Sequence, residues 1–190
     1  MATPNGSSTA LAIAQVTAAL KDLLQGTLKN ASEVGLGEAG ISLSAPDRIT
    51  TGENEPSALN LFLYRVSPHM LLQDSKVRLK LPLGAVALDL FYLLTAYGSK
   101  DYQAEILLGY AVQAMSAVDS LTPDELRRRL KSASNKALAK AEVGPHALKI
   151  VAQFMSMDDM SKLWSSLQAK YRPSVAYQVT AVVLGGNGNA

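Results

Sequence analysis

Two apolar, aromatic-rich segments constrain the fold of this chain more than any other feature. Residues 59–68 read LNLFLYRVSP and residues 88–98 read LDLFYLLTAYG. In the first segment, leucines alternate with Asn60, Phe62 and Tyr64, so both faces of an extended chain carry mostly apolar side chains. Strands of this kind lie inside a sheet that is covered on each side. The sequence therefore predicts two interior strands, one in each segment.

The rest of the chain predicts further strands, with helices around them. Apolar residues at spacings of three and four indicate helices, and alternating residues indicate strands. The predicted helices run from residue 10 to about 30–32, from 99 or 101 to 118, from 123 to about 133, and from Ser156 past Leu167; the additional strands are 41–44, 146–155 and 175–184. This order favours an α/β (α+β) fold with a mixed central β-sheet of about four to six strands flanked by helices.

The length and apolar content fit one domain. A chain of 190 residues, 48% of them hydrophobic, can bury a sizeable core. Residues 10–184 are predicted to form this single domain. Residues 1–9 and 185–190 are polar or glycine-rich, and we expect both to be flexible.

The composition limits the classes of function open to the chain. Its 18 basic and 16 acidic residues give a net charge of +2, which is too balanced to imply binding of nucleic acid or of a membrane surface by bulk charge. The absence of cysteine excludes disulfides, thiolate zinc sites and a cysteine nucleophile, and it fits a cytoplasmic assembly. No run of about 18 uncharged apolar residues occurs, so direct insertion into a membrane is not expected.

No group of residues points to catalysis, a metal or a cofactor. His69 and His146 lie far apart without an HExxH motif, and we expect them to be surface or loop residues. No GxSxG elbow presents a serine nucleophile. The acidic pairs at 124–125 and 158–159 fall in the first turns of predicted helices, where they complement the helix dipole. The sequence therefore predicts a protein that is not an enzyme, and an uncharacterised hydrolase is disfavoured.

Arg127, Arg128 and Arg129 form the strongest run of charge. Such a run can bind phosphates, but no aromatic residue is interleaved to stack on bases. We expect either a solvated helix face or a basic patch that meets an acidic partner protein, and no binding of nucleic acid.

Three segments, in this order, resemble the cap (tail-terminator) family of phage-tail-like extracellular contractile injection systems. They are residues 59–68, residues 82–98 and residues 171–179, which read YRPSVAYQV. The resemblance extends over roughly residues 10–184. Two positions depart from it: His69 stands where the family often has asparagine, and Phe91 stands where it often has histidine.

The resemblance implies an assembly part. It implies a homo-oligomeric ring of six subunits that ends the inner tube and anchors the last layer of the sheath, with sheath and inner-tube proteins as partners. Closed cyclic symmetry uses head-to-tail interfaces, so each subunit presents two different surfaces. The sequence leaves open whether the particle is released, stays in the cytoplasm or is anchored to a membrane.

The cap interpretation also suggests contact residues. An exposed sheet edge can accept a sheath arm by strand addition, and residues 175–184 and 77–81 are the suspected edges. Two tyrosine–arginine pairs, at 64–65 and 171–172, either support the fold through buried rings and loop carbonyls or contact a neighbouring subunit. The candidate contacts are Tyr64, Arg65, Val77, Arg78, Leu79, Arg127, Arg128, Arg129, Arg172, Tyr177 and Val179.

A second interpretation is an adaptor domain of the same kind of particle, which binds a baseplate, cargo or membrane-anchor protein. Formation of a ring without partners would separate the terminator from the adaptor.

Overall fold

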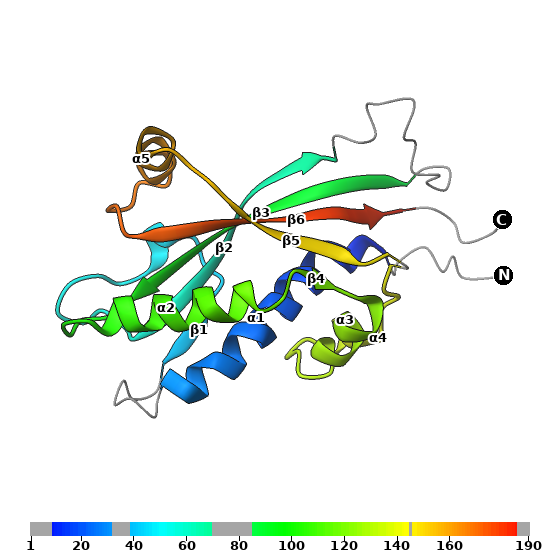
Figure 1. Cartoon of the computed structure of the whole chain (residues 1–190), viewed down its shortest axis with the longest axis horizontal. Coiled ribbons are helices and arrows are strands. Elements are labelled where there is room, and N and C mark those ends of the chain that lie inside the picture. Colours follow the sequence, from blue (N-terminus) through cyan, green and yellow to red (C-terminus); the bar gives the residue numbers. More distant parts are fainter. Residues whose placement is uncertain (1–8, 32–38, 70–84, 145, 186–190) are drawn as a thin grey trace, which may run out of the picture.

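Six strands form one mixed sheet in the computed structural model of this chain, which describes residues 9–31, 39–69, 85–144 and 146–185 (Figure 1). The strands are β1 (Gly40–Ser42), β2 (Ala58–Pro68), β3 (Val86–Tyr97), β4 (Ser120–Leu121), β5 (Leu148–Gln153) and β6 (Ser174–Leu184). The helices are α1 (Ala12–Ala31), α2 (Gln103–Ser116), α3 (Pro123–Leu130), α4 (Lys136–Lys140) and α5 (Met157–Ser166), with the short 3-10 turns η1 (Thr9–Leu11) and η3 (Pro46–Arg48). The predicted α/β class is confirmed. Among the described residues, no helix has the length and apolarity that crossing a membrane requires.

The strand order is β1-β2-β3-β6-β5-β4, which places β2, β3 and β6 in the interior of the sheet. β1 runs parallel to β2, and the other neighbouring strands are antiparallel. The interior positions predicted for residues 59–68 and 88–98 are confirmed. The suspected edge at residues 175–184 is wrong, because β6 pairs with β3 on one side and with β5 on the other. The other suspected edge, residues 77–81, lies outside the described residues.

The larger core lies between one face of the sheet and the helices α1, α2 and α3 (Figure 1). Leu59 and Leu61 of β2 and Leu90 and Tyr92 of β3 point into it and are fully buried. Leu20, on the apolar stripe predicted for the first helix, is buried against them. Each such side chain stabilises the fold by about 1.5–3 kcal/mol, so packing of this face holds the helices in place.

A smaller core covers part of the opposite face of the sheet. Its buried members are Leu93 of β3 and Met160 and Trp164 of α5. Because Leu93 and its neighbour Leu94 are both fully buried, β3 is covered on each face, as its sequence predicts. α5 is thereby fixed against the sheet far from α3 and α4 (Figure 1).

Several local boundaries differ from those predicted from the sequence. β4 has two residues and α4 has five, and neither is long enough to show a periodic pattern. α2 begins at Gln103 because Tyr102 adopts a left-handed conformation with φ of 63°. The capping box at the start of α3 is confirmed, with Thr122 and Glu125 each accepting a backbone N–H of the other.

Candidate functional site

The three segments that carry the family resemblance lie side by side on β2, β3 and β6. β3 ends where β2 and β6 begin, since Tyr97 pairs with Ala58 and Thr95 pairs with Ser174. At the opposite end, Leu88 of β3 pairs with the last residue of β2. The polar residues of the three segments therefore gather in two clusters, one at each end of the central strands.

The first cluster is built around Arg172, just before β6. Its guanidinium forms an ion pair with Glu55, whose side chain in the loop before β2 is only 4% exposed. The other carboxylate oxygen of Glu55 accepts the backbone N–H of Gly98 at 2.8 Å. The Arg172 guanidinium also lies 4.7 Å from the centroid of the Tyr97 ring. A buried carboxylate is costly without a partner, so the ion pair stabilises Glu55 in this position. Together these contacts join three segments that are distant in the sequence.

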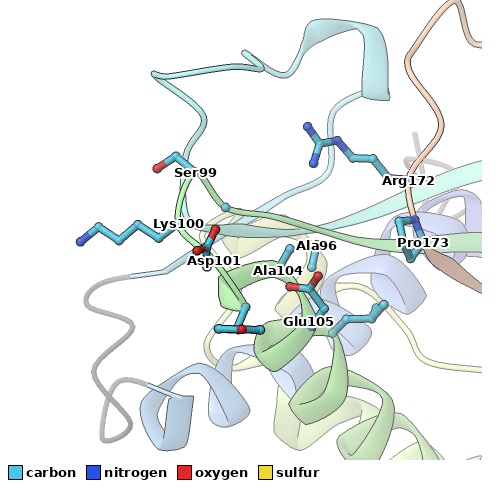
Figure 2. A pocket seen from close by; sticks show the side chains of 11 residues that line it. Ala96, Ser99, Lys100, Asp101, Ala104, Glu105, Arg172 and Pro173 are labelled. Carbon is cyan, nitrogen blue, oxygen red and sulfur yellow. The ribbon is translucent and has the colours of Figure 1, made fainter.

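A pocket of about 550 Å³ opens beside this cluster (Figure 2). Gly98 lines it, and a Cβ there would lie 2.8 Å from the side chain of Gln103, so any larger residue requires Gln103 to shift. Lys100, Asp101 and Glu105 also line the pocket, on the turn that leads into α2 and on its first turn. The lining residues combine charges of both signs, with Lys100 and Arg172 facing the same pocket as Asp101 and Glu105.

The second cluster joins the end of β2 to the start of β3. His69 Nδ1 lies 2.7 Å from Asp89 Oδ1, and both side chains are mostly buried. Asp89 also accepts the backbone N–H of Ala181 at 3.2 Å. Ala181 has a φ of 62° at an irregularity in the β3–β6 pairing, so its N–H needs a partner outside the ladder. The carboxylate supplies that partner, and His69 lies against the same oxygen.

The tyrosine–arginine pair of β2 is arranged around Phe91. A bulge at Tyr64 aligns Arg65 with Phe91 across the β2–β3 ladder. The Arg65 guanidinium lies 4.9 Å from the centroid of the Phe91 ring, and the Tyr64 ring lies 6.2 Å from it. Tyr64 packs into the smaller core, where burial raises the pKa of its hydroxyl, while the Arg65 side chain faces solvent.

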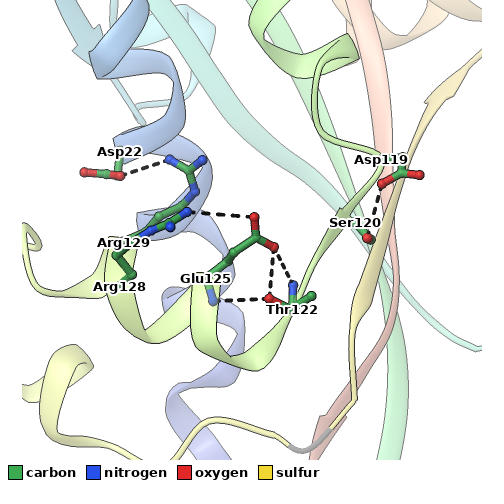
Figure 3. A network of polar contacts seen from close by, with 7 residues as sticks. All are labelled: Asp22, Asp119, Ser120, Thr122, Glu125, Arg128 and Arg129. Carbon is green, nitrogen blue, oxygen red and sulfur yellow. Dashed lines mark hydrogen bonds and ion pairs between the residues drawn. The ribbon is translucent and has the colours of Figure 1, made fainter.

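The three arginines of α3 each meet a carboxylate of the same chain, and Figure 3 shows the contacts of Arg128 and Arg129. Arg127 lies 2.8 Å from Asp124, and Arg128 lies 3.8 Å from Glu125, one turn earlier in each case. Arg129 is mostly buried and lies 3.2 Å from Asp22 of α1, so it fastens α3 to α1. Hydrogen bonds from Thr122 hold the pKa of Glu125 below its usual value. Arg127 and Arg128 therefore belong to exposed local ion pairs, which favours the solvated-face interpretation for these two, whereas Arg129 joins two helices.

The histidines form no metal centre within the described residues. His146 is exposed, as expected, whereas the His69 side chain is only 12% exposed, contrary to a surface position. Among the described residues, no group of three or more histidine, aspartate or glutamate side chains could hold a metal ion.

Comparison with protein families gives this geometry a context. The family described as the Pvc16 N-terminal domain matches residues 15–189, almost the whole chain. The chain belongs to this family. No curated protein matches the chain.

Two solved structures share the fold of this Pvc16 N-terminal domain. One is the PVC sheath/tube terminator of an extracellular contractile injection system in its extended state; it has a TM-score of 0.57 and 19% identity, over 92% of this chain and 57% of that chain. The other is the tube-terminating cap of the anti-feeding prophage, with a TM-score of 0.54 and 17% identity, over 92% of this chain and 55% of that chain. The predicted resemblance to the cap family is confirmed, and this domain spans a little more than half of each cap.

The predicted contact residues lie in different environments in the folded domain. Tyr177 and Val179 are 3% and 0% exposed in the larger core, so both are core residues and neither is a surface contact. Tyr64, Arg65, Arg127, Arg128, Arg129 and Arg172 lie at the places described above. Val77, Arg78 and Leu79 lie outside the described residues.

One surface feature of the domain escapes the sequence reasoning. Phe154 is 94% exposed, Met157 is 71% exposed and Tyr171 is 49% exposed, all around the start of α5. Phe154 falls within the stretch 146–155 that reads as a strand, and β5 in fact ends at Gln153. A fully exposed phenylalanine is not expected inside a strand. Its exposure could have been predicted only from the position at which the strand ends.

Proposed function

We propose that this domain is the terminator of a contractile injection system, which ends the inner tube as a six-membered ring and anchors the last sheath layer. The observation that carries the proposal is the family match over residues 15–189, joined to a fold shared with two tube-terminating caps. The proposed role is structural, and its partners are the inner-tube and sheath proteins.

The sheet offers places where a sheath arm can add a strand. β6 is interior, so the edges of the described sheet are β1 and the β4–β5 side. β4 pairs only with Leu148 and Lys149, which leaves Val151, Ala152 and Gln153 without a strand on their outer side within the described chain. Unpaired backbone groups of this kind are templates for strand addition. The outer edge of β5 is therefore the preferred site for sheath anchoring.

The experiment that tests the ring is the mass of the purified protein by light scattering, with negative-stain images of the same fraction. The proposal expects closed rings with about six times the chain mass of 20.2 kDa. If the protein is a monomer, the measurement is repeated with purified inner tubes, where a terminator still binds the tube end.

The edge proposal has its own test. Ala152→Pro removes a backbone N–H at the middle of the free edge, and it should abolish binding to the sheath protein while leaving the ring intact. A matched control is Ala147→Pro, just before β5 and outside this edge. Equal sheath binding by both variants would contradict anchoring at β5. A protein that binds a baseplate or cargo protein, but neither tube nor sheath, would instead be the adaptor.

A further inference from the structure

Four strongly exposed apolar side chains gather at one end of the molecule. They are Tyr102, Phe154, Met157 and Tyr171, which are 75%, 94%, 71% and 49% exposed, and we call them the aromatic end. Phe154, Met157 and Tyr171 lie around α5, and Tyr102 lies just before α2. Both helices meet the end of the molecule where β3 ends and β6 begins, on opposite sides of the sheet (Figure 1). Exposed apolar side chains that share one end of a molecule mark candidate interaction surfaces, and aromatic residues and methionine are enriched in interface cores.

Part of the aromatic end is held in place by contacts between its side chains and α5. Tyr171 Oη lies 4.0 Å from Met157 Sδ, and the Tyr171 ring lies edge-on to Trp164 with 6.2 Å between centroids. Tyr102 is held in the left-handed region, a conformation that is costly for a side chain with a Cβ and that recurs at functional sites. The Tyr171 and Met157 side chains are therefore partly preorganised and lose less freedom when a partner covers them.

A pocket of about 400 Å³ lies on a different part of the surface, between α1 and the segment that contains α4. Its lining is mixed: the apolar residues are Ala14, Ala18, Leu43, Ala133 and Leu138, and the polar or charged ones are Thr17, Lys21, Asp22, Gln25, Ser132 and Ser134. Leu43 is 40% exposed, so part of this lining is open to solvent. We call this the α1–α4 pocket.

The α1–α4 pocket is also preformed. The buried amide of Gln15 donates to the Leu138 carbonyl oxygen at 3.0 Å, which ties α4 to α1. Asp22 accepts hydrogen bonds from Ser132 and from Arg129, which holds the other wall, and Figure 3 shows the contact with Arg129. The pocket keeps its shape without a partner, and it has room for one or two side chains.

The two surfaces carry opposite charge. Residues 119–149, which include α3 and α4, hold seven basic and four acidic side chains. The segments at the aromatic end, 46–57, 98–105 and 154–173, hold seven acidic and five basic side chains. Exposed lysines on α4, Lys136 and Lys140, thus match the exposed Asp101 and Glu105 beside Tyr102.

From this match we infer that the aromatic end of one copy docks on the α1–α4 pocket of a second copy. The two surfaces are different patches, so the contact is head-to-tail, and repeating it by a rotation closes a ring. The inference rests on the proposed terminator ring and names the surfaces that form it. Apolar side chains then fill the pocket while the charges at the rim set the orientation.

The absence of cysteine makes cross-linking a clean test. Met157→Cys protein is mixed with Ala133→Cys protein under ring-forming conditions and treated with a short bismaleimide. A cross-linked dimer is expected from the mixture and not from either variant alone. The matched control pairs Ala133→Cys with Val66→Cys, since Val66 is 43% exposed on β2 and belongs to neither surface.

The outcomes separate this inference from the proposed function. Rings that cross-link no better through Met157→Cys than through Val66→Cys would overturn the docking surfaces and leave the terminator role intact. If the free protein is monomeric, the same pairs are tested in particles assembled with the inner-tube and sheath proteins, with the same two outcomes. A chain that joins no particle contradicts the proposed function and the inference together.

A charge-reversal test addresses the orientation. Lys136→Glu with Lys140→Glu should weaken ring association about fivefold at low salt, because each rim pair contributes little. Asp101→Lys with Glu105→Lys in the same chain should restore it. A loss of association that the second pair of changes does not repair would place these lysines at a different contact.

Discussion

Two tyrosine–arginine pairs that look alike in the sequence have opposite arrangements in the fold. In the pair at 171–172, the arginine is turned inward onto the buried Glu55, and the tyrosine is half exposed. In the pair at 64–65, the tyrosine packs into the smaller core and the arginine faces solvent over Phe91. The first arginine therefore holds the fold together, while the second faces solvent.

The difference arises from partners that are distant in the sequence. Glu55 lies 117 residues before Arg172 and reaches it only because the loop before β2 ends beside the start of β6. Arg65 has no ion pair with any carboxylate of the described residues, and its guanidinium lies over a ring on the neighbouring strand. A local motif thus cannot tell a buried, ion-paired arginine from one that faces solvent.

The largest expected effect comes from removing the inward arginine. Arg172→Ala leaves the Glu55 carboxylate buried without its ion pair, so the free energy of unfolding should fall by about 2–4 kcal/mol in urea titrations. Arg172→Lys keeps the charge but loses the planar fork over Tyr97, and it should recover only part of the loss. If Arg172→Ala unfolds at the same urea concentration as the parent protein, the contact contributes nothing and the comparison fails.

The second effect tests how tightly this cluster is packed. Gly98→Ala places a Cβ 2.8 Å from the Gln103 side chain, so it should destabilise the protein by about 1–2 kcal/mol. Gly109→Ala is the matched control, because a Cβ at Gly109 meets no atom within 4 Å and alanine favours the helix. Equal thermal midpoints for the two variants would show that the Gln103 side chain moves away from the new Cβ at little cost in stability.

A smaller effect on stability is expected at the outward arginine. Arg65→Ala removes an exposed cation–π contact, which costs at most about 1 kcal/mol. If Arg65 contacts a neighbouring subunit, the same change should lower the mass measured by light scattering at unchanged stability. A full-size ring from a stably folded Arg65→Ala protein would remove this residue from the interface.

The smallest effect separates the two tyrosines by pH. Burial raises the pKa of Tyr64 above its ordinary value of 10.0, and the neighbouring Arg65 opposes part of the rise. Its contribution to stability is therefore complete below pH 10.0 and is lost as the pH rises through the folded-state pKa. Tyr64→Phe should flatten the decline of stability in this alkaline range, whereas Tyr171→Phe serves as the exposed control. An identical decline in both variants would mean that Tyr64 ionises without cost.

The features that the sequence predicts are those set by local patterns. Continuous apolar runs locate β2 and β3, and the Thr122–Glu125 capping box marks the start of α3. The interior place of β6 is not predictable in this way, because alternation of residues is the same for a central strand and for an edge. The His69–Asp89 contact depends on strand register and on a bulge near Ala181, which no local pattern reports.

The same limit applies to the candidate surfaces, because contacts between distant segments are not visible in a local pattern. The arginine run is visible in the sequence, but its carboxylate partners on α3 and α1 become evident only in the fold. Phe154 reads as part of a strand, and only the end of β5 at Gln153 explains its exposure. Contacts between subunits depend on two surfaces of the folded chain at once, so they lie beyond any pattern within one segment.

The central claim is that this domain ends a tube, and the most direct measurement is where it binds. Purified inner tubes are incubated with the protein carrying a gold-labelled affinity tag and are imaged by electron microscopy. The account predicts label at one end of each tube and tubes that stop growing once they are labelled. Label distributed along the tube walls, or tubes that keep elongating with the protein bound, would contradict it.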